Sequence, residues 1–369
     1  MNRNLSKYVC LSLSAFAAGF AFVPAVKADD KADEGGKIVL SGLADVYYQY
    51  GFNHTQAGVP TAGRAFDVKS NEFGLSLLEV NVKKTTGTKN NVGFTAQFTV
   101  GKTADLVNAT EPAGVNTYKY IQQLYGTYVA NGANPVTFDF GKFTTHMGYE
   151  VIESSNNDNY SRSFLFNYAV PLYHSGVRAT KTLTSGLTGQ VSFTNGWNNV
   201  EDDNGGKTIG AQLAYAPTAK YNLTLNYIGG DEFTGAGLAK NLNVQVGELV
   251  ATYNLSDKVK VGANAVYASA NKAGVGGTWS GQALYGRTQL KANTALAVRL
   301  EHFEDTNGLR TGVVQNLNEV TATYEYNLAA NMVSRLEFRH DHSGAGFFAT
   351  KNGVSKNQDT LTYSQVFKF

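Results

Sequence analysis

From about residue 37 to the C-terminus, apolar and polar residues alternate one by one in segment after segment of the chain. In one such segment, Tyr221, Leu223, Leu225 and Tyr227 stand between polar residues. Successive side chains of a β-strand point to opposite faces, so this period of two indicates strands that are apolar on one side and polar on the other. The repeated pattern predicts an all-β chain.

The connections between these segments alternate strictly in length, a short turn following each long polar loop. The strands are expected near 37–52, 68–82, 90–102, 119–130, 136–142, 172–182, 187–196, 207–216, 220–229, 243–254, 258–269, 278–289, 292–304, 316–327, 331–342 and 357–369. A transmembrane β-barrel has short periplasmic turns and longer outer loops, whereas a sandwich mixes connection lengths. We therefore predict a transmembrane antiparallel up-and-down β-barrel of about sixteen strands over residues 37–369, wide enough to enclose a water-filled channel.

The composition excludes several other classes of protein. A hydrophobic content of 43% argues against disorder, and 31 basic against 29 acidic residues argue against nucleic acid as a partner. A single Cys excludes a disulfide-stapled scaffold. Beyond the first 30 positions no apolar run reaches the ~18 residues that a transmembrane helix needs.

The N-terminus predicts export. Residues 1–28 combine basic Arg3 and Lys7, an apolar stretch over 8–23 and a small-residue cleavage site ending at Ala28, as in a cleaved secretory signal peptide. A membrane anchor is excluded because the apolar run is too short and polar sequence follows directly. Residues 29–36 are expected to form a short periplasmic segment before the barrel. Export of a β-barrel predicts the bacterial outer membrane as its location.

Aromatic residues mark the ends of the predicted strands. Tyrosines lie beside several short turns, as in the interfacial girdle of a membrane barrel: Tyr215, Tyr221, Tyr253 and Tyr326. A soluble exported β-sandwich would not need them there. The last strand alternates and closes on aromatic Tyr363, Phe367 and Phe369, which resembles the C-terminal signal that outer-membrane barrels present to their assembly machinery.

Charged strand residues should point into the lumen, because a lipid-facing Arg or Lys at mid-membrane costs ~2–4 kcal/mol. With the apolar face outward, the lumen-lining residues are Asp139, Arg178, Arg287, Arg299, Glu301, Glu319, Glu325, Arg335, Glu337, Arg339 and Lys368. They could set up a local field across the channel or simply solvate and cross-pair the inner wall. Their near-even count of basic and acidic groups predicts neither cation nor anion preference.

The longest predicted loop, 143–171, is the strongest candidate for a functional element. It carries the polar residues His146, Glu150, Glu153, Asp158 and Arg162 among several aromatic residues. Because so much apolar surface should be buried, we expect the loop to fold into the channel and form a constriction. Its acidic residues would then face basic wall residues such as Arg299, Arg335 and Arg339 and produce a transverse field. A surface lid or a subunit contact remains the alternative.

Signals for enzymatic or metal chemistry are weak. His340 and His342 lie on one face of a strand and could bind a metal, but no further ligand is suggested and a solvated rim explains them better. The acidic stretch 201–204 is explained by an ordinary loop, and Gly274–Gly277 by a flexible one. We predict no cofactor, no metal site, no catalytic residues and no enzymatic activity.

The stretch Asp139–Thr180, together with Asn195–Asn198, resembles the putative beta-barrel porin-2 family of Gram-negative outer-membrane proteins. The matching elements are Gly141–Phe143, Gly148–Glu150, Asn159–Ser163 and Pro171–Arg178. The resemblance implies a porin-like channel and supplies no catalytic residues.

These observations predict a porin for passive diffusion of small hydrophilic solutes, narrowed by the loop 143–171. Two alternatives stay open: a barrel that mainly acts as a surface adhesin or binding protein, and a barrel-embedded hydrolase. The expected partners are outer-membrane lipid, small hydrophilic solutes and the barrel assembly machinery, with no nucleic acid. A homo-trimer is suggested by analogy with other sixteen-stranded porins.

Overall fold

The computed structural model of the chain describes residues 36–55, 58–87, 90–232, 242–272 and 274–369. The predicted signal peptide and all but the last residue of the segment 29–36 lie outside this part of the chain. Among the described residues, no helix has the length and apolar character needed to cross a membrane.

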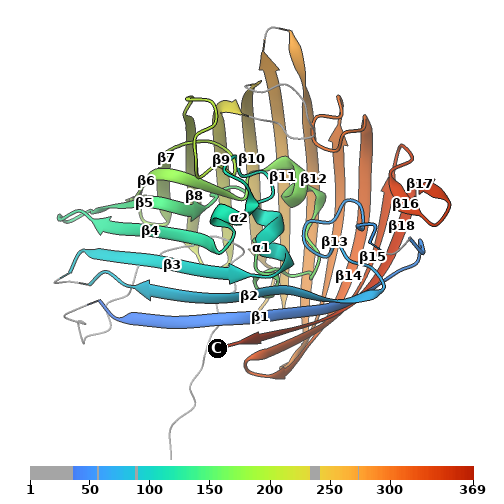
Figure 1. Cartoon of the computed structure of the whole chain (residues 1–369). Coiled ribbons are helices and arrows are strands. Elements are labelled where there is room, and N and C mark those ends of the chain that lie inside the picture. Colours follow the sequence, from blue (N-terminus) through green and yellow to red (C-terminus); the bar gives the residue numbers. More distant parts are fainter. Residues whose placement is uncertain (1–35, 56–57, 88–89, 233–241, 273) are drawn as a thin grey trace, which may run out of the picture.

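Sixteen antiparallel strands form one closed barrel, confirming the predicted fold class (Figure 1). Each strand pairs with its neighbours in sequence, and β1 closes the ring against β18. The barrel strands are β1 (Ile38–Gly51), β2 (Glu72–Lys84), β3 (Val92–Val100), β4 (Ile121–Val129), β5 (Val136–Thr144), β6 (Tyr173–Thr184), β7 (Leu187–Thr194), β8 (Thr208–Thr218), β9 (Tyr221–Glu232), β10 (Leu242–Asn254), β11 (Val259–Lys272), β12 (Val275–Lys291), β13 (Thr294–Asp305), β14 (Gln315–Ala329), β15 (Met332–Ser343) and β18 (Asn357–Lys368).

The remaining elements lie in the long loops. The helices α1 (Lys102–Val107) and α2 (Val115–Tyr118) occupy the connection between β3 and β4, and α1 packs against β2 and β3. The short strands β16 (Phe348–Thr350) and β17 (Gly353–Ser355) form a separate hairpin between β15 and β18. Two short helical turns, η1 (Ser154–Asn156) and η2 (Leu165–Ala169), lie between β5 and β6.

The two faces of the wall differ as the alternation predicts. On β14, Val320 and Tyr324 are 49% and 46% exposed, whereas the intervening Thr321 and Thr323 are fully buried. Large apolar side chains therefore cover the outside, and polar side chains point inward against other groups. This inverted arrangement suits a barrel in lipid and not a soluble β-sandwich.

The ring closes at the two ends of the barrel sequence. Residues Leu43–Gly51 of β1 pair in register with Thr360–Lys368 of β18, so that blue β1 and red β18 are neighbours in Figure 1. The last residue continues the ladder, because Gly42 N donates to Phe369 O at 2.9 Å and Phe369 N donates to Gly42 O at 3.0 Å. The C-terminal strand thus provides hydrogen-bond partners for the backbone of β1 as far as Phe369.

Some element boundaries differ from those predicted. β2 begins at Glu72 and not near residue 68, because Gln49 Nε2 donates to Asp67 O and Lys69 O and holds that segment as a loop. Gly276 and Gly277, expected in a flexible loop, belong to β12. A Cβ on Gly276 would lie 1.9 Å from Ala270 O, so this close pairing of β11 and β12 needs a glycine.

Deleting Tyr363–Phe369 should abolish insertion into the outer membrane. The deletion exposes backbone groups of β1 and β15 to lipid, where each unsatisfied group costs several kcal/mol. Membrane yield and heat-modifiable migration on a denaturing gel measure insertion. A matched control replaces 349–354 of the β16–β17 hairpin by a short Gly-Ser turn, which leaves the barrel ladder intact. Normal insertion of the strand deletion would contradict the prediction.

Candidate functional site

The connection between β5 and β6, residues 145–172, passes into the barrel, and we call it the inward loop. Its aromatic residues pack against the wall rather than against solvent. The ring of Tyr149 stacks on that of Tyr285 from β12, with centroids 3.9 Å apart. Trp279 Nε1 donates to Ala169 O at 3.2 Å, and Phe164 is fully buried. The apolar surface of the loop is therefore covered in part by β12, and elsewhere Tyr160 packs on Tyr47 of β1.

A buried ion pair joins the inward loop to the wall. Arg299 Nη1 on β13 lies 2.6 Å from Glu150 Oε1 of the loop, and Arg299 Nε lies 2.6 Å from Glu319 Oε1 on β14. The side chains of Arg299, Glu150 and Glu319 are at most 2% exposed. The guanidinium also donates to Ser161 O at 2.7 Å. Glu150 thus contacts the wall directly instead of facing it across water.

Two further arginines hold loop carbonyl groups. Arg335 on β15 donates to Ser154 O at 2.5 Å and to Asn157 O at 2.8 Å. Arg339 on the same strand donates to Arg162 O at 2.6 Å and pairs with Asp341 at 2.6 Å. Both arginines therefore bind the loop backbone, while Arg339 Nη2 is buried without a hydrogen-bond partner among the described residues.

Wall carboxylates bind backbone N–H groups of the same loop. Glu337 accepts hydrogen bonds from Tyr160 N at 2.6 Å and from Ser161 N at 2.9 Å. Glu301 accepts from the N–H groups of Phe164 and Leu165, both at 2.6 Å. Each of these two side chains accepts two backbone N–H hydrogen bonds, so together they fix the path of the loop at four backbone positions.

Of the other polar residues of the loop, two contact different parts of the wall and one contacts the loop itself. Glu153 accepts from Gln97 at 3.0 Å and from Gln122 at 2.7 Å. Asp158 lies 2.8 Å from Lys260 on β11. Arg162 donates to loop carbonyl groups, among them Val151 O at 3.2 Å and, closer, Tyr160 O and Ile152 O.

His146 is separate from this network. Its Nε2 atom lies 3.0 Å from Tyr227 O on β9. Burial lowers the pKa of His146 to about 4, so the ring is neutral at physiological pH. It adds no charge to the lumen.

Lys368 lies at the end of β18 and is partly exposed. The other remaining predicted wall residues form two groups. Arg178 Nε on β6 lies 2.8 Å from Asp139 Oδ2 on β5. Arg287 on β12 lies 2.6 Å from Glu325 on β14, and Arg335 pairs with the same carboxylate at 2.8 Å. The structure therefore brings Arg287, Glu325 and Arg335 together and leaves the pair Asp139–Arg178 on another part of the wall.

Sequence reasoning missed several wall residues that bind the loop, among them Glu248 on β10, which accepts from Gly148 N at 2.8 Å. Asp45 on β1 accepts from Ser154 Oγ at 2.6 Å and from Tyr160 Oη at 3.1 Å. Lys260 binds Asp158, as described above. The period-two alternation already placed Lys260 on a polar strand face, so the same inside–outside rule could have found it.

The two histidines considered for a metal site, His340 and His342, each contact a residue of β18. His340 Nδ1 lies 2.7 Å from Asp359 Oδ1, and His342 Nδ1 lies 2.7 Å from Asn357 Oδ1, each across to β18. The described part of the chain holds no group of three side chains suited to a metal ion.

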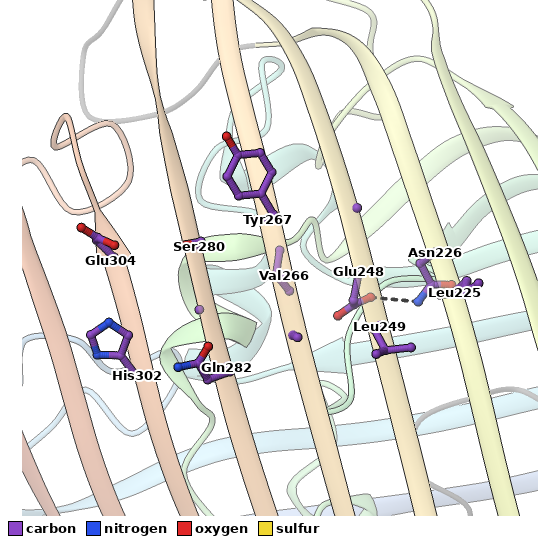
Figure 2. Close-up of a pocket in the computed structure, with 13 residues that line it drawn as sticks. Leu225, Asn226, Glu248, Leu249, Val266, Tyr267, Ser280, Gln282, His302 and Glu304 are labelled. Atoms are coloured by element: carbon purple, nitrogen blue, oxygen red, sulfur yellow. Dashed lines mark hydrogen bonds between the residues drawn. The ribbon is translucent and has the colours of Figure 1, made fainter.

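Figure 2 shows a shallow pocket on the wall formed by β9–β13. Its rim includes the exposed side chains of Leu249 and Tyr267, together with Glu304. Glu248 and Asn226 alternate with such exposed residues and are buried, joined by a 2.8 Å hydrogen bond. The pocket therefore opens on the outer face of the barrel and is not part of the lumen.

Comparisons with known proteins agree with this architecture. The family model described as Putative beta-barrel porin-2, OmpL-like matches residues 37–369. None of the curated proteins compared with the chain matches it.

Solved structures with the same barrel fold come from several bacteria. The outer membrane channel DcaP of Acinetobacter baumannii has a TM-score of 0.61 at 12% identity, covering 92% of this chain and 99% of that chain. The trimer form of OmpT of Vibrio cholerae has 0.59 at 11%, covering 91% and 100%. An anion-selective porin from Comamonas acidovorans has 0.58 at 10%, covering 90% and 100%.

Substituting Arg299 by Ala should lower the free energy of unfolding by about 3–5 kcal/mol, because Glu150 and Glu319 would remain buried without their partner. Equilibrium unfolding in urea, with the protein in lipid vesicles, measures the change. The control Lys272→Ala breaks the half-exposed pair with Asp231 and should cost less than ~1 kcal/mol. Equal effects of the two substitutions would contradict the prediction.

Proposed function

Because the chain belongs to the putative beta-barrel porin-2 family, we propose that it is an outer-membrane porin through which small hydrophilic solutes diffuse passively. The observation that carries this proposal is a closed sixteen-stranded barrel with an apolar outside and a polar, charged inner wall. A barrel of this strand number has room inside for an aqueous path beside a folded loop.

The inward loop is proposed to narrow that path. Its contacts with Arg299, Glu337 and Glu301 support this role, because they hold the loop backbone against the inner wall at several points. A loop fixed by buried ionic contacts reduces the cross-section permanently and does not act as a mobile lid. We therefore propose a static constriction.

The outer surface and the relatives suggest how the porin is assembled. Exposed apolar residues such as Phe140, which is 74% exposed, would contact outer-membrane lipid. We propose a homo-trimer, by analogy with the trimer form of the Vibrio cholerae protein. The aromatic C-terminal strand is proposed to engage the barrel assembly machinery during insertion.

Purified protein should form open pores in planar bilayers and should make liposomes swell in iso-osmotic solutions of small sugars. The physical reason is the polar inner wall, which allows water to fill the lumen across the membrane. Stepwise single-channel conductance and the rate of light-scattering change are the measurements. Heat-unfolded protein is the control. Folded protein that gives neither steps nor swelling would overturn the porin proposal and favour a surface-binding role.

Removing the centre of the inward loop should raise single-channel conductance and admit larger sugars. The variant replaces residues 154–159 by a short Gly-Ser linker and keeps the anchor between Glu150 and Arg299. The same shortening applied to the exposed loop 201–205 serves as a control and should leave conductance unchanged. If both folded variants conduct like the parent, the inward loop does not form the constriction.

A further inference from the structure

The charged groups of the lumen differ in how far they remain accessible to water. The carboxylates that hold the inward loop are covered: the side chains of Glu150 and Glu319 are 2% and 0% exposed. The exposed fraction is 22% for Arg287 and 17% for Lys260. Their carboxylate partners, Glu325 and Asp158, are 8% and 9% exposed. In both pairs the cation is about twice as exposed to water as the anion, or more.

Lys260 and Arg287 are also direct cross-strand partners on β11 and β12. Like charges placed opposite each other in a sheet destabilise it unless negative charge lies nearby. Asp158 from the inward loop neutralises Lys260, and Glu325 is shared between Arg287 and Arg335. These three cations, Lys260, Arg287 and Arg335, are the basic cluster. Their ion pairs involve two carboxylates, so the paired groups carry an excess of one positive charge.

Other accessible lumen charges do not offset this excess. Arg178 and Asp139 form a pair whose members are 13% and 12% exposed, so neither sign dominates there. On the β2–β4 side, Glu153 is partly exposed, and Lys83 on the inward face of β2 is exposed. Among the described residues, the basic cluster is therefore the group of lumen ion pairs in which cations outnumber carboxylates.

We propose that the basic cluster is an anion-binding station beside the inward loop and that it makes the channel prefer small anions over cations. The inference rests on the proposed porin function and adds a class of solute to it. A positive excess in a confined space with low-dielectric walls is poorly screened, so it raises the local anion concentration. Arg287, whose side chain is the most exposed of the three, would make the first contact with a carboxylate or phosphate group.

The test is the reversal potential of single channels in a KCl gradient, with chloride as the probe. The parent should show a chloride-to-potassium permeability ratio above one. The double variant Lys260→Gln/Arg287→Gln leaves one cation against two carboxylates, so the ratio should fall below one, a change of about threefold or more. The variant should still fold, because Glu325 keeps Arg335 and Asp158 keeps the hydroxyl of Tyr149 at 3.2 Å.

Two controls separate the cluster from general effects of charge. Lys272→Gln removes one positive charge near the outer end of β11, where its pair with Asp231 is 50% and 40% exposed, and should leave the ratio unchanged. The double variant Lys260→Arg/Arg287→Lys keeps both charges and should keep the anion preference. Heat-modifiable migration checks that each variant is folded.

The outcomes distinguish this inference from the proposed function. A parent that conducts but prefers potassium, or a double neutral variant with an unchanged ratio, overturns the anion station and leaves the porin in place. A folded parent without any conductance overturns the porin itself, and the anion station with it.

Discussion

The absence of water from the hydrocarbon core of a bilayer requires every backbone N–H and C=O group of a spanning sheet to find a partner within the protein. A sheet meets this requirement by closing on itself. Here the closure depends on the pairing of β1 with β18, the two strands farthest apart in the barrel sequence. The hydrogen bonds between Gly42 and Phe369 extend this seam to the last residue of the chain. The inward-facing side chains and the inward loop have their positions only because this ring is closed.

Closure also divides the side chains into two populations that obey opposite rules. Outward positions such as Val320 carry apolar groups because they meet lipid. Inward positions can carry charged side chains. Where the inward loop packs on these side chains, they are buried inside the barrel. Arg299, Glu150 and Glu319 thus form an ionic core that resembles the interior of a soluble protein more than the surface of a pore. Such groups hold the loop because breaking one ion pair would leave a buried charge without a partner.

The burial of these charges separates their structural role from a role in conduction. Glu150 and Arg299 neutralise each other at contact distance, so they contribute little field to the open part of the lumen. Lys260 and Arg287 lie on neighbouring strands and retain more exposure than their partners. Counting charged residues in the sequence gives near-equal numbers of each sign, yet the solvent meets an unequal subset. Any selectivity follows from that subset.

Local alternation was sufficient to predict most of the barrel. The period of two identifies each strand and its polar face, and the lengths of the connections indicate a membrane barrel, because both are properties of short segments read one at a time. The same rule placed Arg299 and Glu337 on the inner wall. It missed the start of β2 and the inclusion of Gly276 in β12, because these depend on side-chain and backbone contacts with other segments.

What the sequence by itself determined is therefore the approximate number of strands, the closure into a barrel and the inward orientation of most charged strand residues. Only the tertiary structure decided which charges meet each other. The partners of Arg299 lie on the inward loop and on the neighbouring strand. Lys260 pairs with Asp158, which lies 102 residues away in the sequence. Such pairings depend on the path of a long loop through the lumen, which no local periodicity encodes. Burial then follows from that path, because a charge is covered only when another segment packs on it.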